Sequence, residues 1–215
     1  QWTRLHAGEA FIRGLDATKI REAYFRDGPA VKGYIEAQVP RSVFNVLWNG
    51  SFTEEYKNLT AEYQFIEKYK EAWSAAPYPP TFVTVDTVVI QSGHVLLVKR
   101  KGYPGKGLFA LPGGFIGQHE RIQDAAIREL KEETRIALPK EDLHASIVDE
   151  KVFDHPDRST RGRTITHAFC LNLGTGKLPK VKGDDDAEHA FWLPFSDIAV
   201  KQSMFYEDHY HLIQN

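Results

Sequence analysis

The stretch Gly114–Ile136 reads GFIGQHERIQDAAIRELKEETRI, which predicts a glycine-containing loop followed by a helix over Arg121–Thr134. On that helix, Glu129 lies three residues before Glu132 and four before Glu133, so the three carboxylates share one face. The positions that fall on a different side and can pack against a sheet are Ile127, Leu130 and Thr134. We therefore expect an amphipathic helix that presents three acidic side chains away from the core.

Carboxylates that are clustered on one helix face repel one another. A hard divalent cation relieves this repulsion, because Mg²⁺ and Mn²⁺ prefer carboxylate oxygens as ligands. Mg²⁺ usually takes only one or two protein carboxylates and completes its shell with water and substrate phosphates. The pattern therefore indicates a metal site and a phosphate-bearing substrate. The alternative is a solvated helix, on which the glutamates pair with Arg128, Lys131 and Arg135.

The length of 215 residues suits one large domain, or one domain with a smaller piece. Charged residues make up 26% of the chain and hydrophobic residues 42%, a balance that is typical of a folded globular protein. The net charge of −2 argues against nucleic-acid binding through bulk charge. No stretch is long and apolar enough for a transmembrane helix, and Arg4, Glu9 and Arg13 interrupt any signal peptide. Cys170 is the only cysteine, which excludes an internal disulfide and fits a cytoplasmic protein.

Three segments are expected along the chain. Residues 1–50 are read as short helices broken by turns, and since the chain begins at Gln1 we expect a fragment of a longer protein. Residues 51–80 combine a helix over Ser51–Trp73, with apolar positions every three or four residues, and a proline-rich linker. Ser51 and Glu54 resemble a capping box at the start of that helix. The helix either packs along its own domain or carries a coiled-coil seam.

Residues 81–215 show strands, one central helix and then more strands, which predicts an α+β domain with a mixed sheet. The chain is expected to end in a short helix near Phe205–Ile213. The expected strands lie near Thr81–Ile90, His94–Arg100, Leu143–Phe153, Arg163–Leu173 and Ala190–Leu193.

The spacing within Gly114–Ile136 resembles the Nudix hydrolase box, with Arg135 at the position where the family has glycine. The resemblance implies an α/β/α sandwich and the hydrolysis of a nucleoside diphosphate linked to another group. It also implies that Arg128, counted with the catalytic residues, orients a carboxylate, either Glu120 or Glu132. The implied ligands of Mg²⁺ or Mn²⁺ are Glu129, Glu132, Glu133 and the carbonyl of Gly113.

Five further segments together resemble the C-terminal half of bacterial bifunctional nicotinamide-mononucleotide adenylyltransferase/ADP-ribose pyrophosphatases: residues 77–82, 110–115, 158–167, 183–187 and 207–209. The implied reaction is the cleavage of ADP-ribose to AMP and ribose 5-phosphate, in NAD metabolism. The implied substrate-binding residues are Arg100, Arg161, Arg163, Phe115 and Asp186. Basic loops, core packing and a solvated acidic turn are the alternatives for these residues.

The front of the chain resembles the same family. Residues 15–21, LDATKIR, are similar to a late phosphate-binding motif of the adenylyltransferase domain. Thr18 and Arg21 match that motif, whereas Asp16 stands where the family has serine. The resemblance implies that residues 1–50 are the C-terminal remnant of a Rossmann-like nucleotidyltransferase domain, whose nucleotide-binding part is expected before Gln1.

Two alternatives to ADP-ribose hydrolysis stay open. One is a Nudix-like module that senses ADP-ribose without hydrolysing it, as in repressors of NAD metabolism. That reading calls for a DNA-binding winged helix after the Nudix fold and an eroded box, and the sequence shows neither. The other is a Nudix hydrolase for NADH, a dinucleoside polyphosphate or a damaged nucleotide, since the box residues hold only metal and diphosphate. The oligomeric state is also open, with a homodimer among the alternatives.

Overall fold

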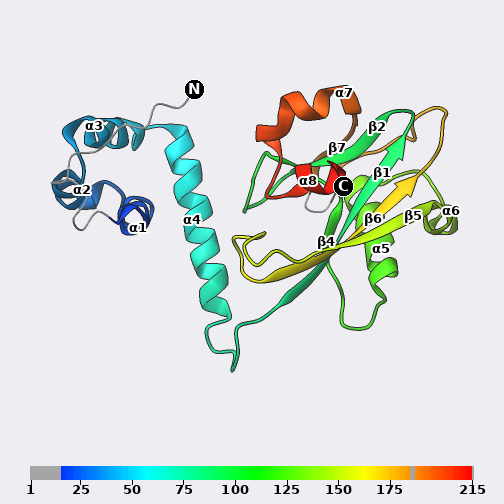
Figure 1. Cartoon of the computed structure of the whole chain (residues 1–215), viewed down its shortest axis with the longest axis horizontal. Helices are drawn as coiled ribbons and strands as arrows, with labels where there is room; N and C mark the ends of the chain where they lie inside the picture. Colours follow the sequence, from blue (N-terminus) through cyan, green and yellow to red (C-terminus); the bar gives the residue numbers. More distant parts are fainter. Residues whose placement is uncertain (1–15, 185–186, 215) are drawn as a thin grey trace. The chain divides into compact units, whose positions relative to one another are not determined.

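The structure, a computed structural model, describes residues 16–184 and 187–214 (Figure 1). The chain divides into two compact units, Gln1–Lys68 and Tyr69–Asn215. Helix α4 (Glu54–Ala72) therefore begins in the first unit and ends in the second. The expected segment boundaries after residues 50 and 80 stay predictions.

The first unit is helical, as its sequence predicts. It contains α1 (Ala17–Asp27), η2 (Gly28–Val31), α2 (Lys32–Gln38), α3 (Arg41–Gly50) and the start of α4. Asp16 caps α1, because its side chain accepts hydrogen bonds from the backbone N–H groups of Thr18 and Lys19. The hydroxyl of Tyr56 donates to the Tyr24 carbonyl at 2.5 Å and so ties α4 to α1. The buried side chains of this unit's core are Tyr24, Ile35, Phe44 and Tyr56.

The predicted capping box at Ser51 is wrong. Helix α4 begins at Glu54, and the hydroxyl of Thr53 accepts the N–H of Tyr56 at 3.2 Å. Ser51 instead donates its hydroxyl to the carbonyl of Trp48, at the end of the preceding helix. The N-terminal cap therefore lies two residues later than expected, because Ser51 still belongs to the turn that ends α3.

The second unit is built on a mixed sheet. Its strands are β1 (Phe82–Gln91), β2 (His94–Arg100), β3 (Phe109–Ala110), β4 (Gly113–Phe115), β5 (Ile147–Phe153), β6 (Thr164–Asn172) and β7 (Ala187–Pro194). The order is β3-β2-β1-β6-β5, with β4 added to β1 and β7 to β2. Of the strand pairs just named, β1 and β6 run parallel and the others are antiparallel. The mixed sheet expected from the sequence is confirmed.

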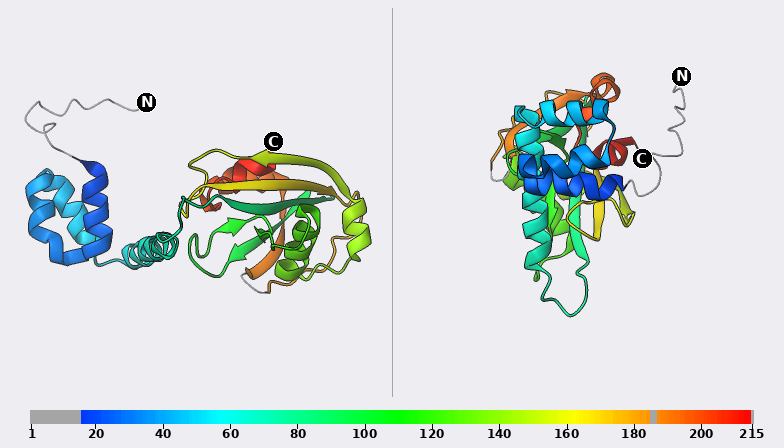
Figure 2. Two further views of the ribbon diagram at one scale, coloured as in Figure 1. Left: turned by 90° about the horizontal axis from the view of Figure 1, so that it is seen from below. Right: turned by 90° about the vertical axis from the view of Figure 1, so that its left-hand side faces the viewer.

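Helices cover both faces of this sheet (Figure 2). The helices are α5 (Ile122–Thr134), α6 (Lys140–Ala145), α7 (Phe195–Ile198), η3 (Ala199–Met204) and α8 (His209–Gln214). Val85 and Val89 of β1 pack with Leu130 of α5, in one hydrophobic core. Val88, which points to the opposite face, packs in a second core with Leu212 of α8. The unit is therefore an α/β/α sandwich.

Two predicted element boundaries are wrong. The strand expected from Leu143 begins at Ile147, because Leu143 lies on the short helix α6 and is fully buried there. The terminal helix expected from Phe205 begins at His209, because the backbone before it pairs with β3: the N–H of Tyr206 donates to the carbonyl of Phe109 at 2.8 Å. No described helix is long and apolar enough to cross a membrane.

Candidate functional site

Gly113 and Gly114 begin the short strand β4, which is part of the glycine loop that connects β3 to α5 along the chain. Strand β4 pairs with β1, so that Gly113 is opposite Asp86 and Gly114 is opposite Val85. A Cβ atom on Gly113 would lie 2.1 Å from the Val85 carbonyl oxygen, and one on Gly114 would lie 2.6 Å from the carboxyl carbon of Glu129. Position 113 therefore requires glycine, because backbone atoms block a Cβ there, whereas a Cβ at position 114 would displace the Glu129 carboxylate that lies against this backbone.

Arg128 connects the acidic side chains of the box. Its Nε and Nη2 atoms donate to the two oxygens of Glu120, at 3.0 and 2.7 Å. Its Nη1 atom donates to Glu129 at 2.8 Å and to Glu132 at 3.0 Å, and Nη2 also donates to the Phe115 carbonyl. The Arg128 guanidinium holds the pKa of Glu120 at about 2, well below its usual range. Arg128 thus bonds to both carboxylates that the sequence suggested for it and fixes the loop as well.

Glu133 lies deeper than the other box carboxylates. Its side chain is buried and accepts the backbone N–H of Gly113 at 3.0 Å. Burial raises the pKa of Glu133 to about 8, and the negative charge of Glu129 acts in the same direction. Near neutral pH the Glu133 carboxyl therefore keeps its proton unless a positive charge comes close.

Asp86, on β1, is a second buried carboxyl at this site and was not predicted. It is 5% exposed and accepts the hydroxyl of Thr166 at 2.6 Å, and burial raises its pKa. A single carboxylate within the valine-rich strand Phe82–Gln91 is the sequence signal that could have revealed it, because an unpaired buried charge is costly in a core.

The carboxylates fit a hard divalent cation by their chemistry, though they are not arranged as ligands here. Within residues 16–184 and 187–214, no three His, Cys, Asp or Glu side chains form a group that could hold a metal ion. The guanidinium of Arg128 donates to one carboxylate oxygen of Glu129 and to one of Glu132. Burial is the main cause of the raised pKa of Glu133, and the charge of a divalent cation beside it would favour the ionised carboxylate.

Phe115 and Arg161 lie together beside the box. The Arg161 guanidinium carbon is 5.0 Å from the centre of the Phe115 ring, whose other neighbour is the ring of Phe82 at 5.9 Å. The Nε atom of Arg161 is buried and has no hydrogen-bond partner among the residues that the structure describes. The guanidinium carbon of Arg100 lies 4.2 Å from the centre of the Tyr206 ring. Two of the predicted substrate-binding arginines are thus held against aromatic rings.

In the described part of the chain, the contacts of the other predicted site residues do not connect them to the box carboxylates or to the pair of Phe115 and Arg161. Arg163 donates to the carbonyl of Asp154, and Asp186 lies outside the described residues. In the first unit, the guanidinium of Arg21 donates to the Thr18 hydroxyl at 3.5 Å. The position of that unit relative to the box is not defined.

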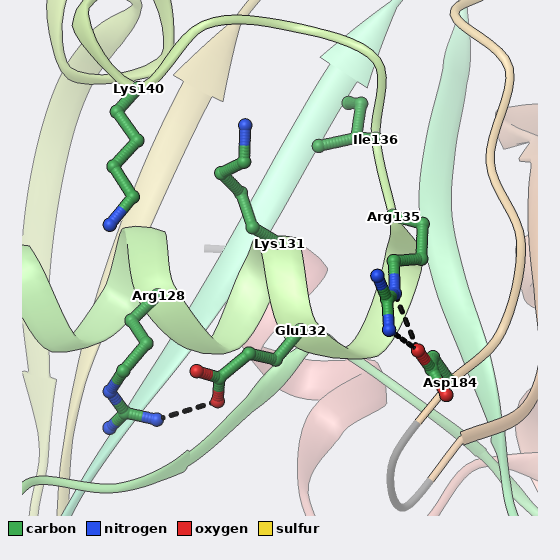
Figure 3. Close-up of a pocket in the computed structure, with 7 residues that line it drawn as sticks. All are labelled: Arg128, Lys131, Glu132, Arg135, Ile136, Lys140 and Asp184. Carbon is green, nitrogen blue, oxygen red and sulfur yellow. Dashed lines mark hydrogen bonds and ion pairs between the residues drawn. The ribbon is translucent and has the colours of Figure 1, made fainter.

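A groove of about 630 Å³ runs along the outer side of α5 (Figure 3). At one end, Arg135 forms an ion pair with Asp184, and at the other Arg128 contacts Glu132. Arg135 has the left-handed φ of 48° that ends the helix, which is the conformation that glycine adopts most easily. Arg135 therefore takes, at the glycine position of the box pattern, the backbone conformation that suits glycine.

Comparison with known proteins assigns the family. The NUDIX domain model matches residues 80–215, more than half of the chain, so the chain belongs to the NUDIX domain family. A crystal structure of a bifunctional NMN adenylyltransferase/ADP ribose pyrophosphatase from Francisella tularensis, in complex with AMP and a manganese ion, superposes with a TM-score of 0.87 at 40% identity. The match covers 94% of this chain and 60% of that one, and so includes the helical segment before the Nudix domain.

Two characterised relatives match by sequence. An ADP-ribose pyrophosphatase from Methanocaldococcus jannaschii is 39% identical over 116 residues, which is 54% of this chain and 63% of the relative. The ADPR responsive transcriptional repressor NtrR from Acinetobacter baylyi is 29% identical over 163 residues, which is 73% of this chain and 60% of the relative. The chain thus spans somewhat under two thirds of the length of each.

Proposed function

We propose that this chain hydrolyses the pyrophosphate bond of ADP-ribose and releases AMP and ribose 5-phosphate. The observation that carries the proposal is the group of carboxylates around Gly113 and Gly114, in which Glu129 and Glu133 contact the loop and Arg128 holds Glu120 and Glu129. Membership of the NUDIX family and the pyrophosphatase relative from Methanocaldococcus jannaschii support it.

The reaction requires Mg²⁺ or Mn²⁺ at the carboxylates. Glu129, Glu132, Glu133 and the carbonyl of Gly113 would hold the metal, and the manganese ion of the Francisella structure supports this choice of cation. Such an ion, when bound, activates water and neutralises charge on the diphosphate. The carboxyl of Glu133 must lose its proton to act as a ligand, so its environment favours metal binding at higher pH.

The side chains around the metal site position the metal ligands and orient the substrate. Arg128 keeps Glu129 and Glu132 at fixed positions through charge-assisted hydrogen bonds. The Phe115 ring, stacked beside Arg161, offers a flat surface and a positive charge for a nucleotide. Arg100, Arg163 and Asp186 complete the proposed set of substrate contacts.

We also propose that residues 1–50 are the end of a nucleotidyltransferase domain, with Thr18 and Arg21 as remnants of its phosphate-binding motif. The match to the bifunctional Francisella protein, which extends over the helical segment, supports this. A bifunctional relative also supports a role of the chain in NAD metabolism.

A second candidate function is ADP-ribose sensing without hydrolysis, which the similarity to the repressor NtrR favours. Product analysis decides between the two. The purified chain is incubated with Mg²⁺ and, in separate reactions, ADP-ribose, NADH, a diadenosine polyphosphate and 8-oxo-dGTP. We expect AMP and ribose 5-phosphate, formed preferentially from ADP-ribose. Calorimetric binding of ADP-ribose with no hydrolysis of any compound would establish the sensor instead, and preference for another compound would reassign the substrate.

A further inference from the structure

His209, the first residue of α8, lies beneath the loop that precedes the box. Its side chain is 6% exposed, and its Nδ1 atom accepts the backbone N–H of Leu111 at 3.0 Å. A ring nitrogen that accepts a hydrogen bond carries no proton, so the neutral His209 ring bears its proton on Nε2. Burial keeps the ring neutral by lowering the pKa of His209 to about 4.

The contact with His209 is one of three that fix consecutive residues of the loop. The N–H of Leu111 is held by α8. The carbonyl of Pro112 accepts both the N–H and the hydroxyl of Thr87 on β1, at 2.8 and 3.0 Å. The N–H of Gly113 is bound by Glu133 on α5. Helix α8, strand β1 and helix α5 therefore fix the backbone of residues 111–113, to which the Glu133 carboxyl is hydrogen-bonded.

The position of His209 is itself strongly constrained. Asp208, its neighbour, accepts two hydrogen bonds from the guanidinium of Arg158, at 2.9 and 2.8 Å, and the Arg158 side chain is 4% exposed. The ring of Tyr206 packs against the His209 ring with centres 5.5 Å apart. The ion pair of Asp208 with a buried arginine, together with an aromatic contact, thus anchors the residue that supports Leu111.

We propose that His209 is a positioning residue, which acts through the Leu111 N–H to hold Gly113 and thereby place the Glu133 carboxylate for metal binding. The inference rests on the proposed metal-dependent function. Loss of the acceptor leaves the buried Leu111 N–H without a partner, so the loop shifts to find one. The shift moves the Gly113 N–H, and Glu133 with it.

Three substitutions separate this role from packing. His209→Asn keeps an oxygen at the place of Nδ1, His209→Gln puts the amide at the place of Nε2, and His209→Leu has no acceptor. The control is His211→Leu, which makes the same replacement at an exposed position of α8. The readouts are Mn²⁺ affinity by electron paramagnetic resonance, exchange of the Leu111 amide by NMR, and kcat and KM for ADP-ribose.

We expect His209→Leu and His209→Gln to bind Mn²⁺ about 10-fold more weakly or worse, with a similar fall in kcat, as for other residues that support metal ligands. Exchange of the Leu111 amide should become faster in both, whereas KM should change little. His209→Asn and His211→Leu should resemble the unmodified chain. If His209→Leu does not fold, the comparison of the Gln and Asn variants carries the test.

Equal impairment of the Asn and Gln variants, or unchanged Mn²⁺ affinity in the Leu and Gln variants, would overturn the inference. Its failure can be distinguished from failure of the proposed function. A chain that binds Mn²⁺ but hydrolyses no compound refutes the function, while Mn²⁺ affinity and Leu111 exchange still test His209. A chain that binds no Mn²⁺ refutes the metal site and the inference together.

Discussion

The backbone N–H of Gly113 donates a hydrogen bond of 3.0 Å to the carboxyl of Glu133, and this bond joins the glycine loop to helix α5. The bond places a buried carboxyl, with few compensating charges, at the centre of the proposed metal site. Without metal, the folded chain is more stable when Glu133 is protonated, whereas metal binding needs the ionised carboxylate. The two effects can be measured separately.

Replacing Glu133 by Gln removes the charge and keeps the shape. Turnover of ADP-ribose should fall by several orders of magnitude with little loss of fold, and Glu132→Gln should behave likewise. The measurement is kcat at saturating Mg²⁺, with circular dichroism to check folding. Comparable activity in these variants would refute the assignment of the site.

The same variant should alter the pH dependence of stability in the absence of metal. The folded-state pKa of Glu133, about 8, lies above its ordinary value of 4.5, so its favourable contribution is complete below pH 4.5. This contribution is lost as the pH rises towards 8, by an amount of the order of a few kcal/mol. Urea unfolding in a chelating buffer should show this loss in the unmodified chain and a smaller loss in Glu133→Gln. Parallel curves would contradict the raised pKa.

Gly114→Ala tests the close approach of loop and helix. A Cβ atom there would lie 2.6 Å from the Glu129 carboxyl carbon, so Glu129 must move away. We expect activity to fall at least about 100-fold, as for small displacements of catalytic groups, with little change in stability, because the atoms that must move are the far end of the Glu129 side chain. Gly102→Ala is the control, because a Cβ at residue 102 meets no atom within 4 Å. Similar kinetics in the two variants would show that the contact is not required.

The site could be predicted from the sequence where its residues are close along the chain. The spacing of three or four residues between Glu129, Glu132 and Glu133 is enough to predict one helix face, and the helix expected over Arg121–Thr134 is found at Ile122–Thr134. The roles assigned to these residues stay proposals, since the geometry of a metal complex is not part of a spacing pattern.

The supporting residues could not be predicted in the same way. Leu111 and His209 are separated by 98 positions, and only the packing of α8 on the sheet brings them together. Likewise, Asp86 joins the site because β1 pairs with β4, which is a tertiary contact. The strand misassigned at Leu143 has a different cause: a short buried helix and a buried strand look alike in a short apolar pattern.

Arg135→Gly restores the residue that the box pattern has at this position. Glycine relieves the backbone strain of the left-handed conformation at residue 135. The substitution also removes the ion pair with Asp184, which is largely exposed and contributes less than about 1 kcal/mol to stability. We expect an unchanged or slightly higher melting temperature and unchanged kcat. Arg135→Ala, which loses the ion pair but keeps the conformation, should be less stable than the Gly variant by about 1 kcal/mol. A lower melting temperature for Arg135→Gly than for the unmodified chain would show that the ion pair outweighs the backbone strain, and an Ala variant as stable as the Gly variant would show that residue 135 is not strained.

His209 should make the chain sensitive to acid. Its folded-state pKa, about 4, lies below the ordinary value of 6.5, because burial outweighs the attraction of Asp208 and Glu207. Between these values the unfolded chain binds a proton that the folded chain does not, so stability falls as the pH drops. The loss should approach about 3 kcal/mol when pH is lowered from about 7 to about 4. Urea unfolding of the unmodified chain and of His209→Asn, which has no titrating group at residue 209, isolates this contribution from the carboxyls nearby. We expect the Asn variant to lose less stability over the same range, and equal losses would mean that His209 is protonated in the folded chain.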